Sequence, residues 1–222
     1  MLTFSKRLVP FLFSCMLLNC NFVLSKSKNN DTNQDFFQSF KKSAEQGCSE
    51  AQHNLAFCYF SGVGTNKNID NAFRWCKKSA EQGYAKAECD LGGFYERGIG
   101  TEKDFEKAFK WYQKSAAQGY AEAQYNLAEC YLLGLGTTKN LKQTFEWNKK
   151  AAAQGNAKAQ YSLGCCYEYG AGTEKNLTKA SEWYKKSEDQ DKSTMNNDET
   201  SNASNSTNKE ESSWWNKICS YF

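Results

Sequence analysis

The chain has 222 residues and a formal net charge of +3, and its acidic and basic residues are mixed, which argues against a general nucleic-acid-binding surface. Aromatic residues make up 15% of the chain, enough bulk for a hydrophobic core, and the single proline, Pro10, leaves room for long helices. This length suits one ordinary domain or one short repeat array, and we expect no nucleic-acid partner.

The first 25 residues have the features of a secretory signal peptide. Lys6 and Arg7 precede an apolar run, Leu8–Leu18, that is too short to span a membrane comfortably. We expect cleavage before Lys26 and an exported protein, secreted or held in the periplasm or the secretory-pathway lumen. The alternatives are lipid attachment at Cys20, which would anchor the protein to a membrane, and an uncleaved anchor.

The middle of the chain is a repeat array. Residues 26–34 are polar and are predicted to be disordered. Residues 35–48 match the second half of the repeat and are predicted to cap the array at its N-terminal end. Four copies of a 36-residue unit follow, at 49–84, 85–120, 121–156 and 157–192. A fixed period of this size is typical of a solenoid, in which no unit can bury its apolar face alone.

Each unit is predicted to be a helix, a Gly-x-Gly-Thr turn and a second helix that ends in Gln-Gly. In the first copy the first helix carries Ala51, Leu55 and Tyr59 at i, i+4 and i+8, the buried face of an amphipathic helix. Gly62 of the turn supplies the left-handed conformation that ends a helix. The second helices carry a tryptophan in one register, predicted to be a packing ladder rather than a cage for a cation: Trp75, Trp111, Trp147 and Trp183.

The fourth copy departs from the pattern at its end. Ser181 replaces a phenylalanine, Glu188 an alanine and Asp191 a glycine, so its last helix is predicted to be a terminal cap with a polar outer face. Residues 193–212, rich in Asn, Ser and Thr, are predicted to be a disordered linker. Residues 213–222 place Trp214, Ile218 and Phe222 on one face of a helix. This aromatic tail is expected to cover an open end of the stack or to dock on a protein or a membrane.

The ten cysteines could form disulfides or bind a metal, but their spacing argues against both. Cys58, Cys130 and Cys166 share one slot of the first helix, beside the aromatic core, where a free cysteine acts as a small buried hydrophobe. There is no Cys-x-x-Cys pair, and the one histidine, His53, gives zinc no convincing ligand set. We expect no metal site and no cofactor, while the thiol state stays open.

These slots resemble those of Sel1-like repeat proteins, which are related to the tetratricopeptide repeats. The resemblance rests on the Ala-x-Ala-Gln-x-x-Leu starts, as at 121–127, the Gly-x-Gly turns, the Lys107–Tyr112 stretch and the Ala-Ala-x-Gln-Gly ends, and it covers 35–192. It implies an all-α fold in which antiparallel helix pairs stack into a right-handed superhelical solenoid. It also implies a role in bringing proteins together.

The resemblance further implies that the first helices line a concave surface on which an extended peptide lies. The slots expected to face it vary between copies, and aromatic rings beside amides suit the capture of a peptide. The candidate residues are His53, Asn54, Phe57, Phe60, Asp90, Tyr125, Asn126, Glu129, Leu132, Tyr161, Ser162 and Glu168, with Trp214 and Trp215 of the tail. We expect an exported scaffold or adaptor that binds a protein or peptide; ordinary surface variation is the alternative for any single residue.

The alternative function is enzymatic. One cysteine-rich exported branch of the family is credited with penicillin binding or β-lactamase activity, and Ser39-Phe-Lys-Lys42 matches the Ser-x-x-Lys pattern of penicillin-interacting enzymes. No Lys-Thr-Gly or Ser-Asp-Asn motif accompanies it, and no nucleophile is evidently placed beside His53. That branch also pairs cysteines at slots where this chain has Ala80 and Gln52. We expect no catalytic residues and a protein that is not an enzyme.

Overall fold

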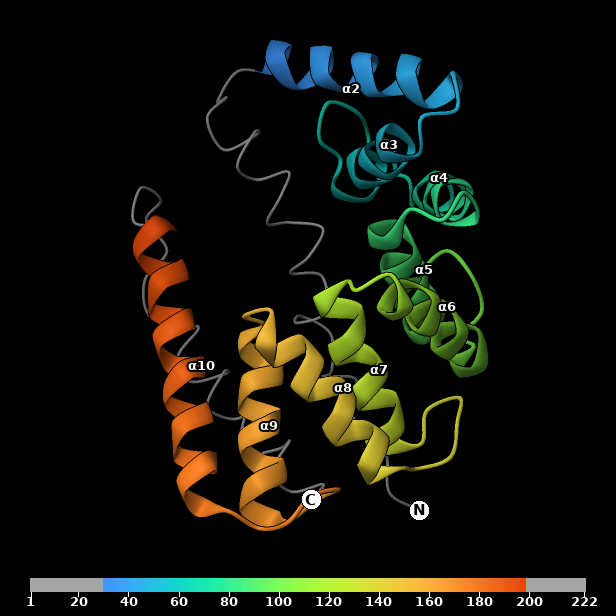
Figure 1. Ribbon diagram of the computed structural model, residues 1–222. Coiled ribbons are helices and arrows are strands. Elements are labelled where there is room, and N and C mark those ends of the chain that lie inside the picture. Colours follow the sequence, from blue (N-terminus) through green and yellow to red (C-terminus); the bar gives the residue numbers. More distant parts are fainter. Residues whose placement is uncertain (1–29, 199–222) are drawn as a thin grey trace, which may run out of the picture. The chain divides into compact units, whose positions relative to one another are not determined.

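The computed structural model describes residues 30–198, which contain helices and no strands (Figure 1). The predicted leader and aromatic tail, including Trp214 and Trp215, lie outside the described residues. The helices are α2 (Asn30–Glu45), α3 (Ser49–Ser61), α4 (Ile69–Glu81), α5 (Ala85–Arg97), α6 (Phe105–Ala117), α7 (Ala121–Leu133), α8 (Leu141–Ala153), α9 (Ala157–Tyr169) and α10 (Leu177–Asp198). Over this part of the chain, no helix is long and apolar enough to cross a membrane.

The chain divides into two compact units, the first ending at Asp104 and the second beginning at Phe105. In the first unit α2 packs on α3, α3 on α4 and α4 on α5. In the second unit each helix from α6 to α10 likewise packs on the next. We call α3, α5, α7 and α9 the first helices and α4, α6, α8 and α10 the second helices of the repeats. The predicted all-α class, built from successive packed helices, is confirmed.

Glycine residues end the first helices, and asparagine side chains cap the start of second helices. Each first helix ends at a glycine with a left-handed backbone, and the N–H of Gly62 donates to the Cys58 carbonyl at 2.8 Å. The second helix α8 starts after Asn140, whose Oδ1 accepts from the Gln143 N–H at 3.1 Å. Asn68 makes the same cap on α4.

The second glycine of each turn lies against the start of the preceding second helix. Gly100 has a φ of +65°, and a Cβ there would lie 2.9 Å from the Phe73 Cβ and 3.1 Å from the Ile69 carbonyl oxygen. Gly64 meets the backbone of Asn33 in the same way, and Asn33 precedes Ile69 by one 36-residue period. Helix α2 therefore occupies the register of a second helix.

Both terminal helices are longer than the sequence predicts. Helix α2 begins at Asn30 rather than at Asp35, and α10 continues to Asp198 rather than ending at residue 192, so residues predicted to be disordered are helical. Asparagine, aspartate and threonine at 30–32 favour a helix N-terminus. Asp191 stands where the other copies have the glycine that ends the second helix, so α10 has no terminator there.

Aromatic pairs join each repeat to the next. The ring of Phe145 meets that of Tyr167 edge-on, with centroids 5.4 Å apart and planes at 87°, and three more pairs repeat this contact. Such a pair adds about 0.5–1.5 kcal/mol to the burial of its rings. The tryptophan ladder differs from the prediction, because all four rings are only partly buried. A lysine Nζ lies 3.9–4.3 Å from each ring centroid, on the same helix.

Candidate partner-binding surface

In the first unit, the structure brings His53 and Asp90 together. The His53 Nε2 lies 2.7 Å from the Asp90 Oδ2, which joins α3 to α5, and the imidazole also packs against the Tyr84 ring at 5.4 Å. His53 is buried and Asp90 partly buried. The His53 Nδ1 is buried and has no hydrogen-bond partner among the described residues. The pair therefore fastens one repeat to the next rather than facing outward.

The other candidates of this unit divide by burial. Phe57 is 2% exposed and belongs to the core, whereas Asn54 and Phe60 are partly buried on α3. The Phe60 ring lies edge-on to Phe94 at 6.0 Å, and the Lys67 Nζ lies 5.3 Å from the Phe60 centroid. Asn54, Phe60 and Asp90 are the candidates of the first unit that retain partial access to solvent.

In the second unit, four candidates are buried: Tyr125, Asn126, Leu132 and Ser162. Tyr125 is 0% exposed and belongs to the core cluster of α7, α8 and α9, so replacing it would open a cavity. Glu129, Tyr161 and Glu168 are partly buried.

Tyr184 of α10 is also partly buried and contacts two of these candidates, although it is not among the residues predicted from the sequence. Its hydroxyl donates to the Glu168 Oε2 at 2.6 Å, and its ring lies 4.9 Å from that of Tyr161. The slot it occupies varies between copies, as Cys76, Tyr112, Asn148 and Tyr184, next to an unvarying tryptophan. That variation is the signal that could have identified it.

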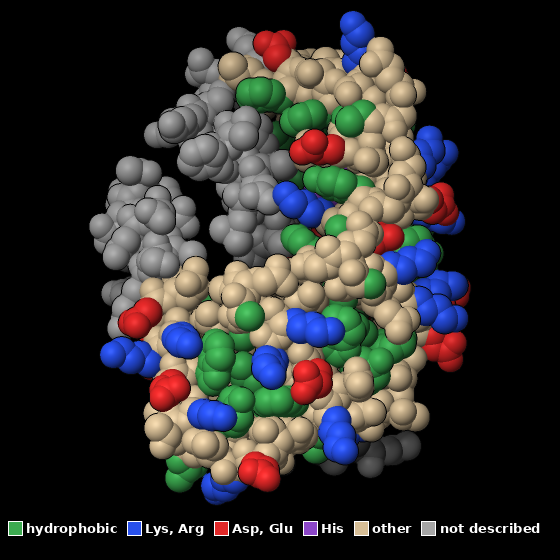
Figure 2. Space-filling model, in the orientation of Figure 1, with side chains coloured by type: hydrophobic (Ala, Val, Ile, Leu, Met, Phe, Trp, Pro, Cys, Tyr) green, Lys and Arg blue, Asp and Glu red, His purple; other side chains and the backbone are tan. Residues whose placement is uncertain are grey.

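Two apolar side chains add to the accessible surface of the second unit. Leu133 is 39% exposed and Tyr169 is 49% exposed, and they are the last residues of α7 and α9. They occupy the same slot one repeat apart, where the first unit has Ser61 and Arg97. On the face shown in Figure 2, cationic side chains lie among acidic ones, as the mixed composition predicts.

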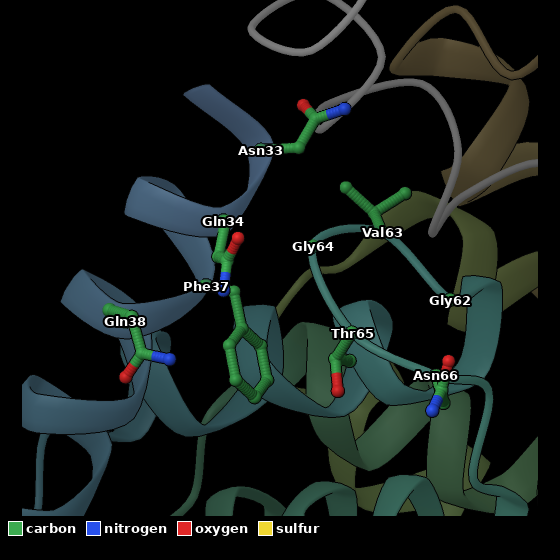
Figure 3. Close-up of a pocket in the computed structure, with 9 residues that line it drawn as sticks. All are labelled: Asn33, Gln34, Phe37, Gln38, Gly62, Val63, Gly64, Thr65 and Asn66. Atoms are coloured by element: carbon green, nitrogen blue, oxygen red, sulfur yellow. The ribbon is translucent and has the colours of Figure 1, made fainter. Parts of the chain in front are cut away.

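A cavity of about 720 Å³ opens between α2 and the turn after α3 (Figure 3). The described residues that line it are Asn33, Gln34, Phe37, Gln38, Gly62, Val63, Gly64, Thr65 and Asn66. They include amides and one hydroxyl but no carboxylate, thiol or imidazole, so this lining lacks the usual acid–base and nucleophilic groups. Ser39 and Lys42 of the Ser-x-x-Lys match are exposed on α2 and are not among them.

The described cysteines are free, and Cys58, Cys130 and Cys166 are buried as predicted. Burial raises the pKa of the Cys166 thiol to about 12, although its hydrogen bond with Asn148 acts to lower that pKa. Burial also holds the pKa of Cys76 well above its usual value, reinforced by the nearby Asp90 carboxylate. These two thiols are protonated at neutral pH and are poor nucleophiles. Among the residues of α2 to α10, no group of three His, Cys, Asp or Glu side chains could hold a metal ion.

Comparison with known proteins gives a consistent result. The Sel1 repeat model matches residues 49–84, 85–120, 121–156 and 157–192. The chain is similar to c5321, a protective antigen of uropathogenic Escherichia coli with an SLR fold (37% identity, TM-score 0.67, covering 69% of this chain and 33% of that one). It is also similar to a Sel1 repeat protein from Oxalobacter formigenes (35% identity, TM-score 0.66, covering 69% and 61%). No curated protein matches.

The chain thus spans about a third of the length of the first of these solved structures and about three fifths of the second. Both matches exceed 30% identity and share the helical-repeat arrangement. The predicted solenoid fold of stacked helix pairs is confirmed.

Proposed function

Because the chain belongs to the Sel1 repeat family, we propose that it is an exported scaffold that binds a protein or peptide partner through the first helices of its units. Sel1 repeat proteins are in general protein-interaction scaffolds, and this role requires a binding surface rather than a reaction centre. The basic, then apolar, leader supports the exported part of the proposal.

The observation that carries the proposal is the partial exposure of aromatic, amide and carboxylate groups on the first helices. Asn54 and Phe60 supply them in the first unit, and Glu129 and Tyr161 in the second. Rings provide contact area at a low entropy cost, and amides and carboxylates pair with the backbone and donor groups of a peptide. Each unit is described by itself, so each offers its own contact region.

The buried candidates have a different role in this proposal. Ser162, Asn126 and Leu132 are at most 6% exposed, and His53 is held by Asp90. Such residues fix the spacing and tilt of neighbouring helices, and through them the positions of the accessible side chains. A partner therefore contacts the partly exposed set, and substitutions in the buried set alter binding through the fold.

Paired charge substitutions test which face binds. Asn54→Arg combined with Glu129→Arg is expected to weaken partner binding by at least tenfold, about 1.4 kcal/mol, because two long cations are placed on the first helices. The matched control, Gln113→Arg with Glu146→Arg, makes the same charge changes on exposed positions of second helices. The partner is first identified by affinity capture with residues 26–222, and its affinity for each variant is then measured by calorimetry.

Circular dichroism verifies that both variants keep the helical content of the parent protein. Equal affinities for the first-helix variant and the parent would overturn the choice of face. A loss of affinity confined to the control would transfer the binding surface to the second helices.

A further inference from the structure

The fourth repeat exposes a slot of the first helix that is buried in the other three. The residues that share this slot with Tyr161 are at most 6% exposed: His53, Cys89 and Tyr125. His53 binds Asp90 of the following first helix. Tyr125 shares a core cluster with Leu163, which also belongs to the following first helix. Helix α9 belongs to the last repeat of the array, and there Tyr161 is only partly buried.

A slot of the second helix changes in the same way. Tyr112 of α6 and Tyr184 of α10 occupy this slot, and Tyr112 is 1% exposed whereas Tyr184 is partly exposed. Helix α10 is the last helix that the structure describes, and it packs on α9 (Figure 1). The ring centroids of Tyr161 and Tyr184 are 4.9 Å apart, and the ring planes meet at 46°. The two rings therefore form one aromatic surface at the end of the second unit.

A carboxylate lies beside these rings. The Tyr184 hydroxyl donates to the Glu168 Oε2 at 2.6 Å, a length typical of a hydrogen bond to an ionised carboxylate. This bond fixes the orientation of the Glu168 carboxylate, and the Glu168 side chain is only partly buried. A carboxylate offers about four lone-pair sites, so the bond from Tyr184 leaves it able to accept from further donors. We call Tyr161, Glu168 and Tyr184 the terminal surface.

Cations of α9 and α10 are engaged away from the terminal surface. The Lys158 Nζ lies 3.8 Å from the Glu122 Oε1. The Lys179 Nζ lies 5.3 Å from the centroid of the Tyr167 ring, and the Lys186 Nζ lies 4.1 Å from that of Trp183. Lys185 is exposed on α10. The negative charge of Glu168, next to two rings, is therefore complementary to a cation that a partner supplies.

We propose that the terminal surface binds an arginine side chain of the partner, an inference that rests on the function proposed above. A guanidinium group is planar, contacts aromatic rings through its face and donates two parallel N–H bonds to a carboxylate, which the ammonium group of lysine does not. Tyr161 supplies the ring on a first helix, and Glu168 supplies the carboxylate. The Tyr184 hydroxyl positions that carboxylate. The partner segment that reaches the second unit is therefore basic.

A short peptide tests this inference before the partner is known. Acetyl-Gly-Arg-Gly-amide is titrated into the full chain labelled with carbon-13, and the ring resonances of Tyr161 and Tyr184 are followed by NMR. We expect saturable shifts of both rings. The same peptide with citrulline in place of arginine keeps the planar shape without the charge. Its dissociation constant is expected to be at least about fivefold larger.

Glu168→Gln separates recognition of a cation from a purely structural role. Glutamine keeps an oxygen that accepts from the Tyr184 hydroxyl, but it has no charge. The variant is expected to bind the arginine peptide at least about fivefold more weakly and the citrulline peptide as the parent does. The matched control is Glu146→Gln, the same change at an exposed position of α8, which is expected to leave both affinities unchanged.

Equal affinity of the parent and Glu168→Gln for the arginine peptide would overturn the inference. So would Tyr161 and Tyr184 resonances that do not respond to the peptide, and a smaller sedimentation coefficient of Glu168→Gln would then assign the surface to a second copy of the chain. The proposed function has a separate outcome. A partner that binds the first-helix charge variant with parental affinity would reject that function, whereas discrimination against citrulline would still establish the arginine site.

Discussion

Gly136→Ala is expected to lower the free energy of unfolding by about 3 kcal/mol or more. The Gly136 φ of +65° is unfavourable for alanine. The added Cβ would overlap the Phe105 carbonyl, lying 2.5 Å from its carbon, and would lie 2.9 Å from the Glu106 Cα. Both neighbours are backbone atoms, so either α6 or the turn itself has to shift to relieve the overlap. Urea denaturation followed by circular dichroism measures the loss.

Gly119→Ala separates the close contact from the backbone strain. Gly119 belongs to the same unit and has a φ of +89°, but a Cβ there would meet nothing within 4 Å. Its substitution is expected to cost about 1 kcal/mol, from strain alone. Equal losses for the two variants would contradict the view that the second glycine of the turn is required for packing on the preceding helix.

Gly164→Ala is expected to cost about 2–3 kcal/mol, because the site has no room for a methyl group. Its Cβ would lie 2.5 and 2.6 Å from the Cε1 and Cδ1 of Tyr184. The ring has to move, and with it the hydroxyl that donates to Glu168. The midpoint and slope of urea denaturation give the loss.

The third repeat suggests a second substitution that should restore the stability lost in Gly164→Ala. It has Ala128 and Asn148 in the slots of Gly164 and Tyr184. In a Tyr184→Asn background, Gly164→Ala is therefore expected to cost nothing, and alanine can gain up to about 1 kcal/mol from helix propensity. A double-mutant cycle measures the coupling. The same cost in both backgrounds would show that the two residues are not matched in size.

The helices were predictable because each slot of the repeat has one physical requirement. Leu127 is fully buried as the i, i+4 pattern predicts, and Gly134 ends α7 with a left-handed backbone. The ends of the array were less predictable. No neighbouring copy fixes where α2 begins or where α10 stops. The helix propensities of the terminal residues therefore decide the bounds, which are Asn30 for α2 and Asp198 for α10.

The candidate surface was predictable only in part, because variation between copies does not by itself indicate exposure. His53 and Asp90 differ from the residues in the same slots of the other copies, and they bind each other between α3 and α5. Tyr184 is large where Gly164 is small. Pairs of residues that contact each other inside the stack can therefore differ between copies. The repeat pattern of the sequence does not distinguish these differences from differences at the surface. The structure supplies the missing information, which is the burial of each side chain.

Site-specific photo-crosslinking tests the central claim most directly. A photoreactive amino acid is placed at Tyr161, on the partly exposed face of α9, and in a separate variant at Glu146, exposed on α8. If the first helices bind the partner, illumination of the complex crosslinks it through position 161 and not through position 146. A complex that forms with the usual affinity but crosslinks only through position 146 would contradict the account.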